Sequence, residues 1–232
     1  MAFDFHDKTV LITGAAGNLG RAVADAFARA GARLVLVDRP GVSPALPAGA
    51  HLALEADLLD AGAVKRAIEQ AIGSCQRIDV VCNLAGGFGM GPVVGEGADA
   101  QWERMFDLNL RTVLNVSRAV VPHMVAAGGG KIVNVGANSA ARGLAQMGAY
   151  CASKDALARL TEALSAEVRD QGVHVNAVLP SVLDTPENRA AMPDADASRW
   201  VDPAALADAI LFLASDAARA IHGALLPVVN RA

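Results

Sequence analysis

Short apolar runs alternate with longer alanine-rich stretches along the chain, and this alternation limits the possible folds more than any other feature. The runs, such as residues 9–13 (TVLIT) and 33–37 (RLVLV), are apolar almost throughout, which is typical of strands buried on both faces of a sheet. Between them, residues 19–30 repeat apolar side chains at helical spacing. The alternation predicts the α/β class, with a doubly wound parallel sheet and helices on both faces.

The same patterns place the remaining elements. Strands are expected at residues 9–13, 33–37, 51–55, 79–84, 131–135, 173–179 and 225–229. Helices are expected at residues 19–30, 60–72, 101–127 with a break near 107–110, 150–171 and 203–215, and Asp60 is the expected N-cap of the second. Residues 181–201 show no clear periodicity, and about 20 such residues in a compact domain predict a functional lid.

Length and charge narrow the class of protein. At 232 residues the chain fits a single domain, residues 1–232, and its 53% hydrophobic content excludes disorder. With 20 basic against 24 acidic side chains, the sequence lacks the concentrated positive charge that binding to nucleic acid or to an anionic membrane requires. No apolar run approaches the roughly 18–20 residues of a membrane span, and residues 1–8 do not resemble a secretory signal.

The cysteines and histidines give no sign of a metal site. Cys75, Cys82 and Cys151 have no paired spacing, which fits reduced thiols without disulfides or zinc. The five histidines are scattered, without the spacing of metal ligands. We therefore expect no bound metal and a cytoplasmic protein.

A glycine-rich turn lies between the first expected strand and the first expected helix. Gly14, Gly17 and Gly20 let the backbone turn tightly near a pyrophosphate, and the helix start at Asn18 and Leu19 supplies N–H donors. Because glycine accounts for 22 of the 232 residues, the spacing alone is weak evidence. Its position after an N-terminal strand indicates a dinucleotide-binding turn, and an ordinary strand-to-helix turn is the alternative.

The end of the second expected strand bears on which dinucleotide binds. Asp38 follows Gly20 by 18 residues, where a carboxylate accepts hydrogen bonds from the adenosine ribose hydroxyls. Such a carboxylate repels a 2′-phosphate and so favours NAD(H) over NADP(H). The neighbouring Arg39 can face a phosphate and opposes that preference. The alternative is that Asp38 only caps a turn.

The only tyrosine of the chain, Tyr150, precedes Lys154 by about one helical turn. Residues at i and i+4 share a helix face, so we expect the phenol and the ammonium to point into one cleft. A nearby ammonium favours phenolate and should lower the phenol pKa from its usual value of about 10. The pair could then exchange a proton with a substrate oxygen or nitrogen while a hydride moves. A solvated polar pair on a helix surface is the alternative.

These residues resemble the short-chain dehydrogenase/reductase family, and the resemblance extends over essentially the whole chain. Beside Tyr150 and Lys154, the segment Asn83-Leu84-Ala85-Gly86 is similar to the family's Asn-Asn-Ala-Gly at the end of the fourth strand. Asn109 is similar to the helix asparagine of the family's catalytic tetrad. The resemblance implies a Rossmann-like fold, a bound NAD(P) cofactor and oxidoreductase activity.

The resemblance also implies roles for single residues. Tyr150 would be the acid–base, Lys154 the cation that lowers its pKa and binds the ribose, and Asn109 the holder of a water in the proton relay. Further cofactor contacts would come from Asp57, Leu58, Asn83, Ala85, Gly86, Pro180 and Thr185. Family members usually assemble, so we expect a homodimer or homotetramer that acts on a small-molecule substrate.

The sequence departs from the family pattern near the expected active site. Ala137 stands 13 residues before Tyr150, where the family has its catalytic serine, and alanine has no donor for a carbonyl oxygen. Ser139 or Asn138 could replace that serine if the loop curls back; otherwise the tyrosine acts without this help. In the glycine turn, Asn18 replaces the middle glycine, and asparagine tolerates left-handed backbone.

The expected lid carries a second resemblance within the family. Residues 183–189 (LDTPENR), together with the missing serine, are similar to quinonoid dihydropteridine reductases. The leading interpretation is an NAD(H)-dependent oxidoreductase of a small carbonyl or alcohol, and reduction of a quinonoid dihydropterin is the alternative. A dinucleotide-binding sensor with little turnover is a third reading. The sequence does not identify the substrate.

Overall fold

Seven parallel strands form one sheet in the computed structural model, which describes residues 3–49 and 51–231. Their order across the sheet is β3-β2-β1-β4-β5-β6-β7. Their bounds are Thr9–Thr13 (β1), Arg33–Asp38 (β2), Leu52–Glu55 (β3), Val80–Asn83 (β4), Gly130–Val135 (β5), Val173–Pro180 (β6) and Leu225–Val228 (β7). The strand order reverses between β1 and β4, and open α/β sheets bind ligands beyond the carboxyl ends of the strands at such a reversal.

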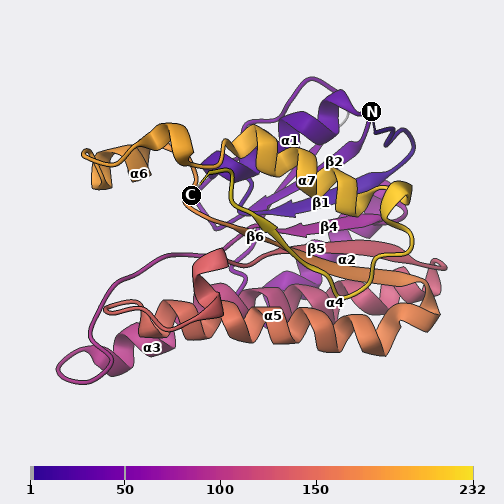
Figure 1. Cartoon of the computed structure of the whole chain (residues 1–232). Coiled ribbons are helices and arrows are strands. Elements are labelled where there is room, and N and C mark those ends of the chain that lie inside the picture. The colour runs from indigo at the N-terminus through magenta and orange to yellow at the C-terminus, as the bar shows by residue number, and fades with distance from the viewer. Residues whose placement is uncertain (1–2, 50, 232) are drawn as a thin grey trace.

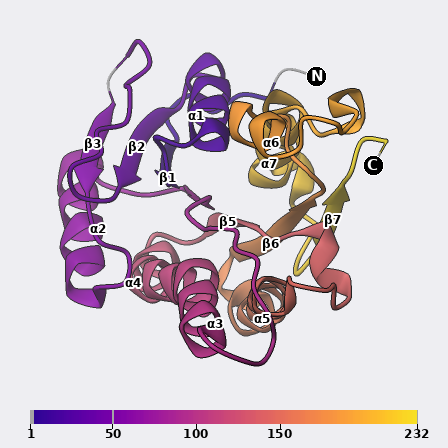
Figure 2. The ribbon, with the colours of Figure 1, turned by 90° about the vertical axis from the view of Figure 1, so that its left-hand side faces the viewer.

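Helices cover both faces of the sheet (Figure 1). Their bounds are Asn18–Arg29 (α1), Ala61–Cys75 (α2), Ala98–Phe106 (α3), Thr112–Ala126 (α4), Gly148–Val168 (α5), Pro186–Ala191 (α6) and Pro203–Ala214 (α7). Figure 2 shows α1 and α7 side by side on one face, and α2, α4 and α5 on the other. The predicted doubly wound α/β fold is therefore confirmed.

Alternating side chains along each strand build two cores, one on each face. Val10 and Ile12 of β1 pack with Phe27 of α1 in the core beneath α1 and α7. Leu11 points the other way and packs with Met124 of α4 in the core beneath α2 and α4. Every residue of β1 is buried, which explains why the strand reads as a continuous apolar run.

The expected strands and helices are present, and most of their ends shift by no more than three residues. The break in the helix expected near residues 107–110 is wrong, because the chain stays helical there. There α3 passes into a π-helical turn, Asp107–Arg111, and the chain continues as α4. A π turn holds an extra residue, which interrupts the apolar spacing without ending the helix. The predicted N-cap is confirmed, because Asp60 Oδ1 accepts hydrogen bonds from two N–H groups of the first turn of α2, at 2.7 and 3.2 Å.

Residues 181–201 are more regular than their sequence indicates, because they contain α6. Thr185 caps this helix, since its hydroxyl oxygen accepts a hydrogen bond from the Asn188 N–H at 3.2 Å. The sequence does not predict α6, because its residues, PENRAA, have no apolar face that would give a helical period.

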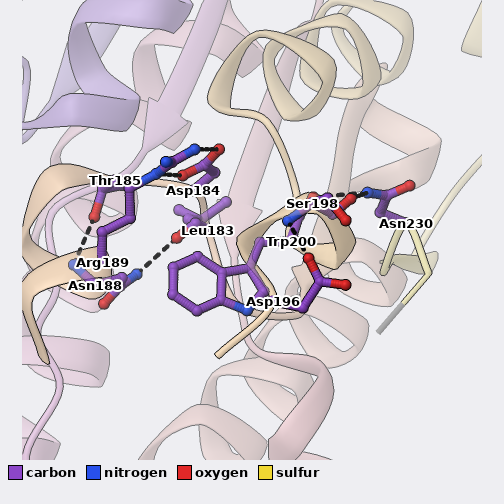
Figure 3. A network of polar contacts seen from close by, with 9 residues as sticks. All are labelled: Leu183, Asp184, Thr185, Asn188, Arg189, Asp196, Ser198, Trp200 and Asn230. Carbon is purple, nitrogen blue, oxygen red and sulfur yellow. Dashed lines mark hydrogen bonds and ion pairs between the residues drawn. The ribbon is translucent and has the colours of Figure 1, made fainter. Parts of the chain in front are cut away.

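Polar contacts fix this segment to itself and to the end of the chain (Figure 3). Arg189 donates to both carboxylate oxygens of Asp184, at 2.5 and 2.8 Å. Asn230, which follows β7, donates to the backbone oxygen of Trp200 at 2.7 Å. Trp200 is buried, so it serves as a hydrophobic anchor for the segment.

No helix within residues 3–49 and 51–231 is both long enough and apolar enough to cross a membrane. In the same residues, no three His, Cys, Asp or Glu side chains are grouped so that they could hold a metal ion.

Candidate active site

The glycine turn brings β1, α1 and the loop after β4 into close contact. Gly14 has a φ of +64°, and a Cβ at this position would lie 2.9 Å from the Cα and N atoms of Ala85. A Cβ on Gly20 would collide with the Gly14 carbonyl oxygen, and the Gly17 N–H donates to that same oxygen at 3.1 Å. The turn therefore requires glycine at positions 14 and 20. The first N–H groups of α1, which lack partners within the helix, are then accessible to a phosphate.

Asn18 is the first residue of α1 and lies outside the left-handed region, so tolerance of left-handed backbone does not explain its presence. Its side-chain nitrogen instead donates to Glu187 Oε2 of α6 at 2.6 Å. This contact joins the glycine turn to the lid segment. Nothing in the sequence indicates it, because the two residues are 169 positions apart.

Asp38 supports the glycine turn directly. Its Oδ2 accepts a hydrogen bond from the Ala16 N–H at 2.9 Å, and its Oδ1 accepts one from the Arg39 N–H at 2.8 Å. Asp38 therefore does cap a turn, as the alternative interpretation expects, and these hydrogen bonds hold its carboxylate beside the glycine turn. Each carboxylate oxygen has a further lone pair, so ribose hydroxyls can bind as well. The Arg39 residue is exposed next to it.

Asp57 and Leu58 follow β3, next to the end of β2. The Ala56 N–H donates to the Asp38 carbonyl oxygen at 2.9 Å, which brings the two strand ends together. Asp57 is exposed and accepts a hydrogen bond from the Leu59 N–H at 2.9 Å, whereas Leu58 is half-buried. The two residues therefore lie on the same side of the sheet edge as Asp38.

Leu84 and Ala85 begin the loop after β4 and are fixed to β1. The Thr13 hydroxyl oxygen accepts hydrogen bonds from the N–H groups of Leu84 and Ala85, both at 3.2 Å. Asn83 is buried, and its side-chain nitrogen donates to Asn134 of β5 at 2.9 Å. The side chain of Asn83 thus links two strands inside the protein, and its expected contact with a cofactor stays a prediction.

Asn109 lies in the π-helical turn and is fully buried, at 0% exposure. Its Oδ1 accepts a hydrogen bond from the Gly87 N–H at 2.9 Å, and its Nδ2 donates to the Gly87 oxygen at 3.0 Å. The same nitrogen donates to Ser153 Oγ at 3.0 Å. These bonds use both protons of the Asn109 amide nitrogen, while the amide oxygen can accept a further hydrogen bond, so the expected role of Asn109 in holding a relay water stays a prediction.

Ser153 is a site residue that the sequence reasoning missed. It is buried on α5, and its hydroxyl donates to the Tyr150 carbonyl oxygen at 2.8 Å while accepting from Asn109. Its position between Tyr150 and Lys154, on the first turns of one helix, is the only feature of the sequence that indicates it. Ser153 and Asn109 together connect the loop after β4 to the start of α5.

Lys154 is 7% exposed, and its Nζ donates to the Val135 carbonyl oxygen at 2.8 Å. Burial lowers the pKa of this ammonium to about 8. Within the described residues no carboxylate pairs with it. A Cβ on Gly86 would lie 3.4 Å from the Nζ atom, an ordinary contact, but 2.9 Å from Asn109 Oδ1, so glycine leaves room for the buried amide of Asn109.

Tyr150 lies on the first turn of α5, and its ring meets the edge of Phe88 with centroids 4.9 Å apart. Burial raises the pKa of the phenol to about 12, with a smaller contribution from Cys151. The expectation of a lowered pKa is therefore wrong for this structure. Removal of solvent penalises the phenolate, and the ammonium of Lys154 is bonded to a backbone oxygen instead.

The region of the missing serine is a 3-10 turn, Asn138–Ala141, that follows the buried Ala137. Cys151 donates its thiol to the Ser139 backbone oxygen at 3.6 Å, which packs this turn on α5. Asn138 is exposed. Among the described residues, no hydrogen bond joins the Ser139 hydroxyl to Tyr150, so a replacement for the missing serine stays a prediction.

Pro180 and Thr185 stand at the start of the lid segment. Pro180 ends β6 and is buried. Thr185 is buried too, and its hydroxyl serves as the cap of α6. Both residues thus lie at the carboxyl edge of the sheet, to which the glycine turn, Tyr150 and Lys154 also belong.

Three comparisons with known proteins agree. The sequence profile of the short chain dehydrogenase family matches residues 8–196. The D-threitol dehydrogenase of Mycolicibacterium smegmatis is 36% identical, over 97% of this chain and 94% of that protein. The cis-4-hydroxycyclohexanecarboxylate dehydrogenase of Sinomonas cyclohexanicum is 33% identical, over 97% of this chain and 96% of that protein. Carveol dehydrogenase from Mycobacterium avium, solved in complex with NAD, aligns with a TM-score of 0.85 at 26% identity, covering 97% of each chain.

The single tyrosine makes the pKa of Tyr150 directly measurable by ultraviolet absorbance of phenolate. In the protein without cofactor we expect a midpoint near 12, because burial disfavours the charged form. The urea-unfolded chain is the control, with a midpoint at the usual value of about 10. Circular dichroism at each pH shows whether the chain is still folded. A folded-state midpoint at or below that of the unfolded chain would contradict the structure.

Two glycine substitutions test the packing of the turn. Gly20→Ala should lower the free energy of unfolding by about 1–3 kcal/mol, because the added methyl forces the backbone apart. It should also weaken binding of a nicotinamide dinucleotide. The matched control is Gly73→Ala inside α2, where a Cβ meets no atom within 4 Å. That change should raise the free energy of unfolding by about 0.5–1 kcal/mol and leave binding unchanged. Urea denaturation measures the free energy of unfolding, and fluorescence titration measures dinucleotide binding. If Gly20→Ala and Gly73→Ala change both quantities equally, Gly20 has no special packing role.

Proposed function

The chain belongs to the short-chain dehydrogenase family, and we propose that it is an NAD(H)-dependent oxidoreductase of a small carbonyl or alcohol. The observation that carries this proposal is the position of Tyr150 and Lys154. Both project from the first turns of α5, beside the loop after β4, whose Gly86 lies next to the ammonium of Lys154. A phenol and an ammonium at the carboxyl edge of such a sheet can move a proton next to a bound dinucleotide.

A bound nicotinamide dinucleotide supplies or accepts the hydride. The close backbone approach at Gly14 and Gly20 fits a pyrophosphate, because any Cβ would fill the turn. Asp38 is proposed to accept hydrogen bonds from the ribose hydroxyls. The other proposed contacts are Gly17, Asn18, Leu19, Arg39, Asp57, Leu58, Asn83, Ala85, Gly86, Tyr150, Lys154, Pro180 and Thr185.

Tyr150 is proposed as the proton donor in the reductive direction. Its phenol is protonated at neutral pH, since its pKa is about 12. When hydride reaches the carbonyl carbon, the phenol proton passes to the carbonyl oxygen, and the phenolate left behind regains a proton from solvent. In the oxidative direction the phenol first releases its proton to solvent, and the phenolate then takes the alcohol proton as hydride leaves. Lys154 is charged below a pKa of about 8, and its positive charge stabilises the phenolate.

The neighbours of this pair are assigned supporting roles. Asn109 and Ser153 position Tyr150 through the hydrogen bonds between the loop after β4 and α5. Because Ala137 has no hydroxyl, it cannot donate a second hydrogen bond to the substrate oxygen. Ser139 stays the candidate for a second donor, and the 3-10 turn would have to move to bring its hydroxyl to the substrate.

The two relatives named above act, by their names, on D-threitol and on cis-4-hydroxycyclohexanecarboxylate. Both names describe alcohols, and this supports an alcohol–carbonyl pair as the substrate. Reduction of a quinonoid dihydropterin is the second candidate, because Ala137 provides little polarisation for a carbonyl. An assay of NADH oxidation with quinonoid dihydropterin against a panel of ketones separates the two. Tight NADH binding without turnover on any substrate would favour the sensor instead.

Two wider expectations stay predictions. The three cysteines are free and buried, which suits the reducing conditions of cytoplasm. Assembly into a homodimer or homotetramer is expected by similarity to the family. Sedimentation analysis of the purified protein would determine the oligomeric state.

Tyr150→Phe tests the proton donor. We expect kcat to fall by about 100-fold to 10,000-fold, the usual contribution of general acid–base catalysis. The NADH dissociation constant should change little, because the substitution removes a single hydroxyl and leaves the glycine turn and Asp38 unchanged. The control is Asp155→Asn, an exposed neighbour on the same helix, which should keep its activity. A Tyr150→Phe protein that retains turnover would exclude the phenol as donor.

Asp38→Asn tests the choice of dinucleotide. This substitution removes the negative charge and retains an oxygen that can accept from Ala16. We expect the preference for NADH over NADPH in kcat/KM to narrow by about tenfold, the effect of removing roughly 1.4 kcal/mol of repulsion. Arg39→Ala should shift the preference in the opposite direction, since it removes a partner for the phosphate. An unchanged ratio in Asp38→Asn would limit Asp38 to capping the turn.

A further inference from the structure

We propose that Phe88 selects the substrate, and that this substrate carries an apolar ring beside its reacting carbonyl or alcohol carbon. The proposal rests on the function proposed above, because it takes Tyr150 as the group that exchanges the proton. Three features around Tyr150 support it. An exposed aromatic ring packs against the phenol ring, an apolar loop is fixed next to it, and few polar side chains are free to bind substrate hydroxyls.

Phe88 is held against the proposed proton donor. The ring planes of Phe88 and Tyr150 meet at 76° in an edge-to-face contact. The residue is nevertheless 55% exposed, so much of the Phe88 ring is open to solvent. A ring fixed at one side and exposed at the other presents apolar surface to any molecule that contacts the phenol. Covering that surface favours binding of an apolar group.

Phe88 belongs to the loop between β4 and α3, residues 84–97, in which Glu96 is the only charged side chain. Three more of its side chains are at least half exposed: Met90 (60%), Val93 (53%) and Val94 (81%). With Phe88 they make four of the seven large apolar side chains that are exposed in the described residues. Such clustering marks a binding surface, whereas scattered exposure does not.

The loop is anchored beside the start of α5. The Gly91 N–H donates to the Gln146 carbonyl oxygen at 2.8 Å, just before the helix that carries Tyr150. A Cβ on Gly148 would lie 2.8 Å from a methyl carbon of Val93, so the loop and the first turn of α5 are in close contact. Figure 1 shows the loop on the same side of the molecule as the lid helix α6. The apolar surface is therefore fixed at the proposed reaction site.

Polar partners for an open-chain polyol are scarce at this site. Ala137 offers a methyl group where the family has a serine hydroxyl. The amide of Asn109 and the ammonium of Lys154 already bond to backbone groups. Each polyol hydroxyl that finds no partner loses its hydrogen bonds to water, and this disfavours binding. A ring with a single reacting oxygen requires only Tyr150.

The test compares an apolar cyclic ketone with an open-chain hydroxyketone in steady-state kinetics with NADH. We expect kcat/KM for 4-methylcyclohexanone to exceed that for erythrulose by about 100-fold, because an apolar site penalises unpaired hydroxyls. Phe88→Ala should lower kcat/KM for the cyclic ketone by about tenfold, chiefly through KM, since it removes binding surface. The value for erythrulose should fall less, so the preference for the cyclic ketone narrows, and the NADH dissociation constant should not change.

Controls separate a specificity role from a structural one. Phe88→Leu, which keeps an apolar side chain, should fall between wild type and Phe88→Ala. Leu46→Ala removes another exposed apolar side chain, on the loop between β2 and β3, and should leave selectivity unchanged. Thermal unfolding of each variant confirms that it is folded.

A preference for erythrulose, or unchanged selectivity in a folded Phe88→Ala protein, overturns the inference and leaves the proposed function intact. A change in oligomeric state without a change in selectivity would identify the loop as an interface between copies of the chain, which also overturns it. NADH binding without turnover of either ketone or of the wider ketone panel contradicts the proposed function, and the inference fails with it.

Discussion

The side-chain amide of Asn109 holds the elements of the site in one geometry. It pairs in both directions with the backbone of Gly87, and it donates to Ser153, whose hydroxyl bonds to the Tyr150 carbonyl oxygen. The loop after β4, the π-helical turn and the first turn of α5 are thereby joined. A buried amide that lost one of these partners would cost about 1–3 kcal/mol. The placement of the phenol therefore depends on a residue that is remote from solvent.

Burial also decides the protonation states of the pair on α5. Lys154 bonds to a backbone oxygen, and loss of solvent lowers its pKa to about 8 while the same effect raises the pKa of Tyr150 to about 12. At neutral pH this gives a protonated phenol and a charged ammonium on the same helix. In the proposed mechanism the phenol gives its proton, and the ammonium stabilises the phenolate that results. In the same proposal, Ala137 and Phe88 make the surroundings of the reacting oxygen poorer in donors and richer in apolar surface.

The sequence predicts the fold more completely than the site, and the reason is physical. Buried strands, the glycine turn and the spacing of Tyr150 and Lys154 are readable, because each depends on residues close together in the chain. The pKa shift of the tyrosine cannot be predicted from the sequence, because it depends on how much solvent the folded chain removes from the phenol. The contacts of Phe88 with Tyr150 and of Asn18 with Glu187 join distant segments and leave no local pattern. The helix α6 is missed because it is too short and polar to show a period.

That Tyr150 delivers the proton is tested most directly by a crystal structure of the complex with a nicotinamide dinucleotide and a cyclic ketone or alcohol. The expected result is a Tyr150 hydroxyl within about 2.6–3.2 Å of the substrate oxygen, the reach of a proton-transferring group, with Phe88 against the substrate ring. A substrate oxygen that instead bonds to Ser139 or another donor, with Tyr150 out of hydrogen-bond reach, would contradict it.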